Sequence, residues 1–289
     1  EPRGAVLTHD AVHAAAQATS AALAVDPGRD RWLACLPLAH VGGLSVVTRA
    51  LATATPLRLL ARADPVAVEA EARAGATLVS LVATALARTD TSRFRRVLVG
   101  GSAAPSERPA NVVATYGMTE TGGGVVYDGR PLPGVEVRAL DGELQVRGPM
   151  LLRAFRDGSD PKDDDGWLAT GDAGSVAANG MVRVVGRIAE VIVTGSEKVW
   201  PAPVEAVLSR HPSVAEVAVT SRADREWGQR VVAVVVPVDP AAPPTLEELR
   251  DWAKEHLPAY AAPRALVLVE HLPRTALGKL RRAELAGLS

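Results

Sequence analysis

The chain has 289 residues, of which 47% are hydrophobic and 22% are charged, a composition typical of a soluble globular protein with about two domains. Lysine and arginine (32) nearly balance aspartate and glutamate (33), which argues against nucleic acid as a partner. Cys35 is the only cysteine and apolar runs such as residues 32–38 are too short to span a bilayer, so we expect no disulfide framework, no cysteine-rich zinc site, no membrane contact and a cytoplasmic location.

The first hundred residues alternate between segments with strand and helix character. Residues 10–24 are Ala-rich and have a candidate N-cap at Thr8 or Asp10, which predicts a helix. His40 begins a predicted loop, residues 40–44, that leads into an apolar helix ending at Ala50. The alternation predicts an α/β fold with a parallel sheet covered on both faces. The other predicted strands cover residues 31–37, 56–61, 76–82 and 97–102, and the other predicted helices cover residues 65–73 and 83–87.

Residues 115–123, T-Y-G-M-T-E-T-G-G, follow an apolar strand at residues 112–114. The Tyr116 ring offers a stacking face for a base, the Thr119 hydroxyl suits a phosphate oxygen, and Glu120 is a hard oxygen ligand for Mg²⁺. The glycines that follow allow the backbone to approach a ligand closely. The stretch predicts a nucleotide site, but a strand followed by a glycine-rich turn is equally compatible with plain architecture.

The connection before this strand is short. Residues 105–111, which include two prolines, are too few for a crossover helix, whereas parallel neighbours need a crossover of about a dozen residues or more. Either these strands are joined unusually or a helical segment is missing from the sequence.

From Gly129 the pattern changes to short alternating segments separated by Pro-Gly, Asp-Gly and Asn-Gly pairs. This pattern predicts antiparallel hairpins or a small barrel-like part with strands at residues 135–139, 143–146 and 181–185. Asp172, which lies between small residues, can hydrogen-bond the vicinal hydroxyls of a ribose.

The chain after Arg187 reads as a small α+β domain. Thr245 is a candidate N-cap for a helix at residues 246–256, and residues 273–279 form a Gly-Lys turn before a last short helix. We therefore predict a large domain at residues 1–188 and a small domain at residues 189–289. The other predicted elements are strands at residues 191–194, 214–220, 230–236 and 265–269, a loop at residues 195–198 and a helix at residues 201–210.

Seven segments, taken in order, resemble the motifs of the adenylate-forming enzymes, which include acyl- and aryl-CoA synthetases, peptide-synthetase adenylation domains and luciferases. They cover nearly the whole chain. Within that superfamily, residues 36–51 and 78–86 look most like the o-succinylbenzoate-CoA synthetases of menaquinone biosynthesis. The seven segments are P-R-G-A-V-L-T-H at 2–9, L-P-L-A-H-V-G-G-L at 36–44, T-Y-G-M-T-E-T at 115–121, G-W-L-A-T-G-D at 166–172, G-R-I-A-E-V-I-V-T-G at 186–195, W-G-Q-R-V at 227–231 and P-R-T-A-L-G-K at 273–279.

This resemblance implies a fold, a reaction and cofactors. The implied fold is a large N-terminal domain of parallel and mixed sheets with helices and a barrel-like part, followed by a small mobile α+β domain. The implied reaction uses ATP, Mg²⁺ and coenzyme A: a substrate carboxylate attacks the α-phosphorus of ATP, and coenzyme A thiolate then attacks the acyl carbon and releases AMP. Such an enzyme takes a small carboxylic acid as substrate, and a homodimer is an option that the sequence leaves open.

The resemblance also assigns roles to individual residues. It implies catalytic roles for Lys279, Thr119, Glu120 and His40, with Glu120 as the metal ligand. For the second carboxylate of o-succinylbenzoate, Arg49 is our candidate cation, although an arginine that snorkels to the surface or pairs with a structural carboxylate is an equal alternative. The remaining implied residues are Gly101, Ser102, Thr115, Tyr116, Gly117, Met118, Asp172 and Arg187 for ATP and AMP; Gly42, Gly43, Ser80 and Thr84 for the acyl group; Gly195, Glu197 and Lys198 for coenzyme A; and Ala189 as hinge.

The sequence departs from the family pattern in three places. A Ser/Thr/Gly-rich phosphate loop is expected ahead of Pro2 and is not in the sequence, so we expect that segments of the protein are missing from it. Arg3 stands where the family has lysine, and Ala189 stands where the family has aspartate or lysine. The alternatives to an o-succinylbenzoate-CoA ligase are another acyl- or aryl-CoA ligase and a non-catalytic homologue that serves as a binding module.

Overall fold

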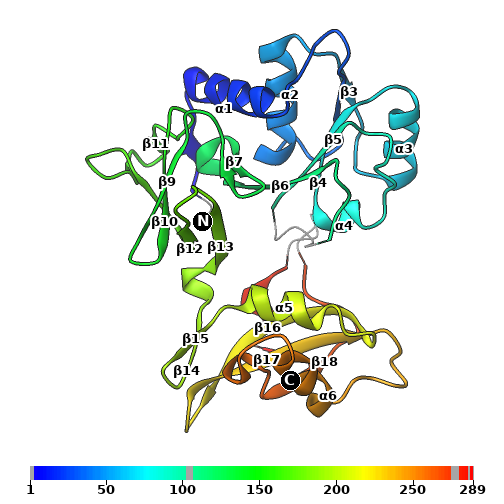
Figure 1. Cartoon of the computed structure of the whole chain (residues 1–289), viewed down its shortest axis with the longest axis vertical. Helices are drawn as coiled ribbons and strands as arrows, with labels where there is room; N and C mark the ends of the chain where they lie inside the picture. The colour runs from blue at the N-terminus through cyan, green and yellow to red at the C-terminus, as the bar shows by residue number, and fades with distance from the viewer. Residues whose placement is uncertain (1–2, 102–106, 275–279, 286, 289) are drawn as a thin grey trace. The chain divides into compact units, whose positions relative to one another are not determined.

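The computed structural model describes residues 3–101, 107–274, 280–285 and 287–288 (Figure 1). The chain forms two compact units: the large unit comprises Glu1–Thr170 and Gly174–Arg183, and the small unit comprises Gly171–Ala173 and Val184–Ser289. Among the described residues, no helix is both long and apolar enough to traverse a bilayer.

A seven-stranded mixed sheet forms the centre of the large unit. Its first five strands are parallel and its last two pairings are antiparallel, which confirms the predicted α/β class. In spatial order the strands are β3 (Leu57–Leu59), β2 (Trp32–Ala34), β4 (Leu78–Leu81), β5 (Arg96–Val99), β6 (Val112–Met118), β7 (Gly123–Tyr127) and β8 (Arg130–Pro131).

Helices cover both faces of this sheet, as its alternating apolar residues require. On β4, Leu78 packs with Val46 and Ala50 of α2 in one core cluster, while Val79 packs with Val68 of α3 in another. Both clusters are almost fully buried, so successive residues of each strand point into opposite cores. The helices of the large unit are α1 (His9–Ala22), α2 (Val41–Thr53), α3 (Pro65–Arg73) and α4 (Ala83–Leu86), and Thr8 is the N-cap of α1.

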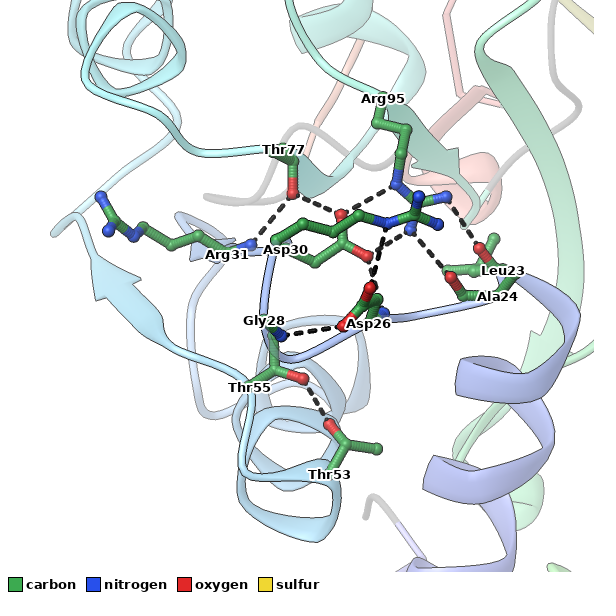
Figure 2. A network of polar contacts seen from close by, with 11 residues as sticks. Leu23, Ala24, Asp26, Gly28, Asp30, Arg31, Thr53, Thr55, Thr77 and Arg95 are labelled. Carbon is green, nitrogen blue, oxygen red and sulfur yellow. Dashed lines mark hydrogen bonds and ion pairs between the residues drawn. The ribbon is translucent and has the colours of Figure 1, made fainter.

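A polar network fixes the amino ends of three neighbouring strands (Figure 2). The Asp30 side chain, which is 0% exposed, accepts hydrogen bonds from Arg95 at 2.6 and 2.8 Å, from Thr77 Oγ1 at 2.9 Å and from the Asp26 amide at 2.9 Å. Arg95 also donates to Leu23 O at the end of α1. Burial by itself raises the pKa of Asp30, but these hydrogen bonds and the Arg95 charge outweigh burial and hold the pKa below its usual value.

The lone cysteine lies directly after β2. Cys35 is 1% exposed, and its Sγ donates to Ser80 O at 3.7 Å. Burial raises the pKa of this thiol to about 11. The thiol is therefore protonated at neutral pH.

β5 and β6 are adjacent and parallel although their connection is short. Residues 100–111 join them, and the described part of this connection contains no helix. Whether a helical segment is missing from the sequence here stays an open prediction.

The hairpin part follows the main sheet. β9 (Glu136–Leu140) and β10 (Glu143–Arg147) pair across Asp141 and Gly142, whose φ angles of 51° and 83° suit the type I′ turn that Asp-Gly favours. A four-stranded sheet has the order β13 (Val182–Arg187), β12 (Leu168–Val176), β10, β9, and β1 (Ala5–Val6) pairs with β11 (Ala154–Phe155). The hairpins are confirmed, while a barrel-like closure stays a prediction.

The small unit is an α+β arrangement around a five-stranded sheet. The long hairpin of β16 (Val214–Asp224) and β17 (Gly228–Pro237) forms its centre, with β18 (Ala265–Leu268) parallel to β17. Thr245 caps α6 in a reciprocal pair with Glu248, as its position predicted. The other elements are β14 (Ile192–Thr194), β15 (Glu197–Val199), α5 (Pro201–Leu208), α6 (Leu246–Lys254), α7 (Arg282–Leu285) and the 3₁₀ turns η2 (Ile188–Glu190) and η3 (Ala259–Ala261).

Two predicted loops are wrong. Residues 195–198 are not all loop, because Glu197 and Lys198 pair with Thr194 and Val193 in a hairpin that turns only at Gly195 and Ser196. Gly195 has φ +64° at the first turn position, where a two-residue hairpin favours glycine.

Residues 40–44 are the second case. They are not a loop, since α2 begins at Val41 and only His40, its N-cap, lies outside the helix. The sequence predicted a loop here because Gly42 and Gly43 are typical of turns, but both lie in the first turn of α2.

Candidate active site

Two parallel strands end side by side, next to a third, at the carboxyl edge of the main sheet. The register pairs Leu81 with Val99 and Val99 with Ala114, so the ends of β4 and β5 lie beside β6, which continues to Met118. Gly101 follows the end of β5 and is exposed at φ +82°, with open space where a side chain would be. Ligands of open α/β sheets bind outside the carboxyl ends of the strands. This edge is therefore our candidate site.

The predicted base-binding stretch is the second half of β6. Thr115 Oγ1 donates to Val99 O at 3.0 Å, and Tyr116 and Met118 pack, partly buried, against the main core cluster. A Cβ on Gly117 would lie 2.0 Å from Gly123 O of the neighbouring strand. Strand packing thus requires glycine at position 117, independently of any ligand.

A 3₁₀ turn, η1 (Thr119–Thr121), presents the predicted phosphate and metal residues. Thr121 is 0% exposed, and its hydroxyl accepts from Met118 N at 3.0 Å and donates to Gly123 O at 2.6 Å. These bonds hold the turn so that Thr119 is exposed and Glu120 is half-buried. The sequence reasoning did not single out Thr121, because an isolated hydroxyl residue carries little information until its backbone partners are known.

The Glu120 carboxylate fits a Mg²⁺ site that is shared with a substrate. Among the described residues, no group of three or more His, Cys, Asp or Glu side chains can hold a metal ion together. Mg²⁺ is usually bound through one or two carboxylates plus substrate phosphates, so a lone half-buried carboxylate at the strand ends suits it. A Mg²⁺ ion held there would neutralise phosphate charge.

The amino end of α2 is held close to the segment before it. A Cβ on Gly43 would lie 2.4 Å from Pro37 O and 2.6 Å from Leu36 O, so only glycine fits this turn of the helix. His40 is exposed and makes no side-chain cap bond, while its carbonyl accepts from Gly43 N and Leu44 N. A Cβ on the preceding residue, Gly42, would lie 3.7 Å from Leu36 Cδ1, which is an ordinary van der Waals contact.

Arg49 is buried in the interior of the large unit. It is 5% exposed, and its guanidinium carbon lies 5.6 Å from the centre of the Trp32 ring. Its Nη2 would lie 3.3 Å from a Cβ on Gly123, so the guanidinium reaches the start of β7. Among the described residues, no carboxylate lies within ion-pair distance of it. A buried cation without an anion is unfavourable unless a ligand supplies one.

Ser80 faces the same side of the sheet as Arg49. It alternates with Val79 on β4 and so shares the face of Leu78, which packs against α2. Ser80 is 8% exposed, and its Oγ has no hydrogen-bond partner in the described part of the chain. Thr84, by contrast, is exposed on α4. Ser45, which the sequence reasoning missed, is also buried and is one helical turn before Arg49.

A second group of predicted residues belongs to the small unit. Asp172 is 5% exposed and pairs with Arg187 at 3.0 Å (Oδ1 to Nε). Gly195, Glu197 and Lys198 lie exposed on the β14–β15 hairpin. Ala189 is exposed in the middle of η2. Ser102 and Lys279 lie outside the described residues.

Two further observations concern neighbouring surfaces. Arg3 lies with its guanidinium carbon 4.2 Å from the centre of the Phe155 ring and donates to Ser159 Oγ at 3.0 Å. A hollow of about 330 Å³ opens beside β2 and β3, and none of the predicted nucleotide residues lines it. We therefore do not assign the nucleotide to that hollow. Its lining residues are Ala34, Leu36, Pro37, Leu38, Leu59, Leu60 and Ala61.

These features define an α/β protein of the class that binds a nucleotide at the carboxyl ends of its strands. The chain belongs to the AMP-binding enzyme family: residues 1–154 match the family model "AMP-binding enzyme", and residues 203–279 match the model "AMP-binding enzyme C-terminal domain".

Two relatives carry the name of the same activity. The "probable 2-succinylbenzoate–CoA ligase" of Mycobacterium tuberculosis is 40% identical over 313 residues, which cover 98% of this chain and 80% of the relative. The 2-succinylbenzoate–CoA ligase of Bacillus cytotoxicus is 33% identical over 329 residues, 100% of this chain and 68% of the relative.

A solved structure is similar over the same length. The o-succinylbenzoate-CoA synthetase of Bacillus subtilis, in complex with its acyl-adenylate intermediate, has a TM-score of 0.89 and 30% identity. The similarity covers 98% of this chain and 66% of that one, so the chain spans somewhat less than two thirds of its length.

Proposed function

We propose that this protein is an AMP-forming acid–thiol ligase that activates o-succinylbenzoate with ATP and transfers it to coenzyme A. The observation that carries the choice of acid is Arg49, a buried cation with no carboxylate partner among the described residues. o-Succinylbenzoate has two carboxylates, one to be activated and one to be held. The named activity of the relatives supports the same acid.

The proposed first step is an in-line substitution at the α-phosphorus. One carboxylate oxygen forms the new P–O bond, the bond to the bridging oxygen breaks, and pyrophosphate leaves. Thr119 and Glu120 lie at the strand ends, where a hydroxyl and a carboxylate with its Mg²⁺ can meet the phosphates. Because this chemistry depends on positioning and charge neutralisation, we propose that Lys279 supplies the remaining positive charge.

The proposed second step forms the thioester. The coenzyme A thiol releases its proton to water, the sulfur attacks the acyl carbon, and the carbon–oxygen bond to AMP breaks, so that AMP leaves as its phosphate anion. We propose that His40 flanks the acyl group, that Asp172 and Arg187 meet the ribose, and that the turn at Gly195 meets coenzyme A. We also propose domains at residues 1–188 and 189–289 with Ala189 as hinge between them.

The first test measures pyrophosphate release from ATP and Mg²⁺ with a panel of acids, followed by mass detection of the thioester. We expect o-succinylbenzoate to be preferred over neutral aryl acids. A preference for acids without a second carboxylate would show that the protein is another acyl- or aryl-CoA ligase. No pyrophosphate release with any acid would favour a non-catalytic binding module. Lys279→Ala is expected to lose adenylate formation and to keep thioester formation from supplied adenylate.

Arg49→Met tests the choice of acid. Losing a charged hydrogen bond to the second carboxylate is expected to raise KM for o-succinylbenzoate by about 10- to 100-fold and to leave KM for ATP unchanged. Arg58→Met, which removes an exposed arginine that pairs with Glu71, is the matched control and is expected to change neither value. An unchanged KM for o-succinylbenzoate in Arg49→Met would remove Arg49 from the site.

The remaining expectations about partners stay predictions. A homodimer is tested by sedimentation at working concentrations, and the absence of a nucleic-acid partner by titration with duplex and single-stranded DNA. The cytoplasmic location also stays a prediction.

A further inference from the structure

Arg282, the first residue of α7, joins three segments of the small unit. Its Nη1 and Nη2 donate to the two carboxylate oxygens of Glu205 on α5 at 2.8 and 2.9 Å. Its Nε lies 3.0 Å from Glu190 Oε2, and Nη1 also reaches Val219 O on β16. A bidentate arginine that also serves a third and a fourth acceptor is held in one orientation.

The cluster is partly shielded from water. The side chains of Arg282, Glu190 and Glu205 are 28%, 36% and 18% exposed. Burial by itself lowers the pKa of Arg282, but the hydrogen bond to Glu205 and the charges of Glu205 and Glu190 outweigh it and raise the pKa. Glu205 also accepts from Val219 N at 2.8 Å, so the carboxylate is itself fixed.

The cluster follows closely, along the chain, the residues that flank positions 275–279. Arg274 and Leu280 form an antiparallel bridge, and Arg281 N donates to Pro273 O at 2.9 Å, so the chain on either side of residues 275–279 is paired. Arg282 follows Leu280 by two residues. Whatever fixes Arg282 therefore also fixes the described chain that follows residue 279.

The cluster also contains the residue that follows the proposed hinge. Glu190 is the last residue of η2 and comes directly after Ala189. Upstream of it, the Gly186 backbone lies against the Trp200 ring, with the position of a Gly186 Cβ only 3.0 Å from Trp200 Cδ1. Residues 186 and 190 are thus both held by the small unit.

We infer that Arg282 is a positioning residue for adenylate formation: by binding Glu190 and Glu205 together, it ties the segment that leaves the hinge to the described residues that directly follow Lys279. This inference rests on the proposed function. It predicts that the cluster matters for the half-reaction that needs Lys279 and much less for the one that does not.

The test separates the two half-reactions in the full chain. Arg282→Met is expected to lower kcat/KM for adenylate formation, measured as pyrophosphate release, by about 10- to 100-fold, and to change thioester formation from supplied acyl-adenylate by less than about 3-fold. Arg282→Lys keeps the positive charge but cannot bind both carboxylate oxygens of Glu205 as the planar guanidinium does. It is therefore expected to show only part of the loss in adenylate formation that Arg282→Met shows.

Glu190→Gln provides a second, milder variant that keeps the Arg282–Glu205 pair. It is expected to slow adenylate formation by about 3- to 10-fold at an unchanged Tm, because only one contact of the cluster is weakened. Glu284→Gln is the matched control, since it removes an exposed ion pair to Arg281 on the same short helix. It is expected to leave both half-reactions unchanged.

The outcomes distinguish the inference from the function on which it rests. Equal loss of both half-reactions in Glu190→Gln, or no loss of either, overturns the positioning role while the ligase assignment stands. Absence of pyrophosphate release from the unmodified chain with every acid overturns the ligase assignment itself.

Discussion

The Asp30 network should determine much of the stability of the large unit, and Arg95→Met tests this. The substitution keeps an aliphatic stem but removes the cation from a carboxylate whose side chain is 0% exposed. Removing one partner of a buried ion pair costs about 3–5 kcal/mol. Because the Arg95 side chain is 28% exposed, we expect the lower end, about 3 kcal/mol.

Thermal unfolding measures the effect. For a unit of this size, about 3 kcal/mol corresponds to a decrease in Tm of roughly 6–12 °C. Since the chain has two compact units, the transition should be followed by a probe of the large unit, such as protease resistance of its strands. Arg58→Met is the control, because it removes an arginine that is exposed and pairs with Glu71. It should shift Tm by less than about 2 °C. Equal Tm values for Arg95→Met and the control would refute the reasoning.

The same network gives the stability a pH dependence with a definite sign. The pKa of Asp30 is lower in the folded protein than its usual value of 3.8, so the folded state favours the ionised carboxylate. Its contribution is fully present above the unfolded pKa and is lost as the pH falls through the folded pKa. We expect Asp30→Asn to lower the free energy of unfolding most above about pH 4, with the difference from the unmodified protein shrinking at lower pH. A difference that grows on acidification would contradict this sign.

Three further changes test other parts of the structure. Gly43→Ala places a Cβ 2.4 Å from Pro37 O, so we expect a loss of about 1–3 kcal/mol in urea unfolding and a raised KM for the acid; unchanged values would mean that the helix start can shift freely. Glu120→Gln should weaken the Mg²⁺ dependence of pyrophosphate release without changing Tm, and an unaltered Mg²⁺ titration would exclude this carboxylate as the ligand. Thr245→Ala removes a reciprocal cap and should cost about 1 kcal/mol in urea unfolding, with no effect on adenylate formation if the small unit still folds.

Local patterns predicted most of the elements. The helix at Pro65–Arg73 has the predicted bounds, because the N-cap Asp64 and Pro65 mark its start. Thr245 was likewise predicted correctly as the N-cap of the helix that begins at Leu246. The alternation of strands and helices predicted the parallel sheet, since the crossover between parallel strands is usually a helix. The wrong loops at residues 40–44 and 195–198 have a common cause: glycine was read as a turn signal where close packing or a two-residue hairpin required it.

The environment of the site could not be read from local patterns. That Arg49 is buried against Trp32 and Gly123 depends on contacts between α2, β2 and β7, which are distant in sequence. The snorkelling alternative for Arg49 does not hold, because the residue is 5% exposed. The roles of Thr121 and Ser45 likewise became visible only when their partners were known, since isolated hydroxyl residues carry little information in a sequence.

The burial of Cys35 makes the protein convenient for spectroscopy. A thiol that is 1% exposed, with a pKa of about 11, will not compete for maleimide dyes at neutral pH. Cysteines introduced at Leu51 in the large unit and Val238 in the small unit, which are 76% and 61% exposed, would then take a donor and an acceptor fluorophore without any need for a cysteine-free background. Energy transfer between the two dyes would follow the separation of the units in real time while ATP, acid and coenzyme A are added in turn.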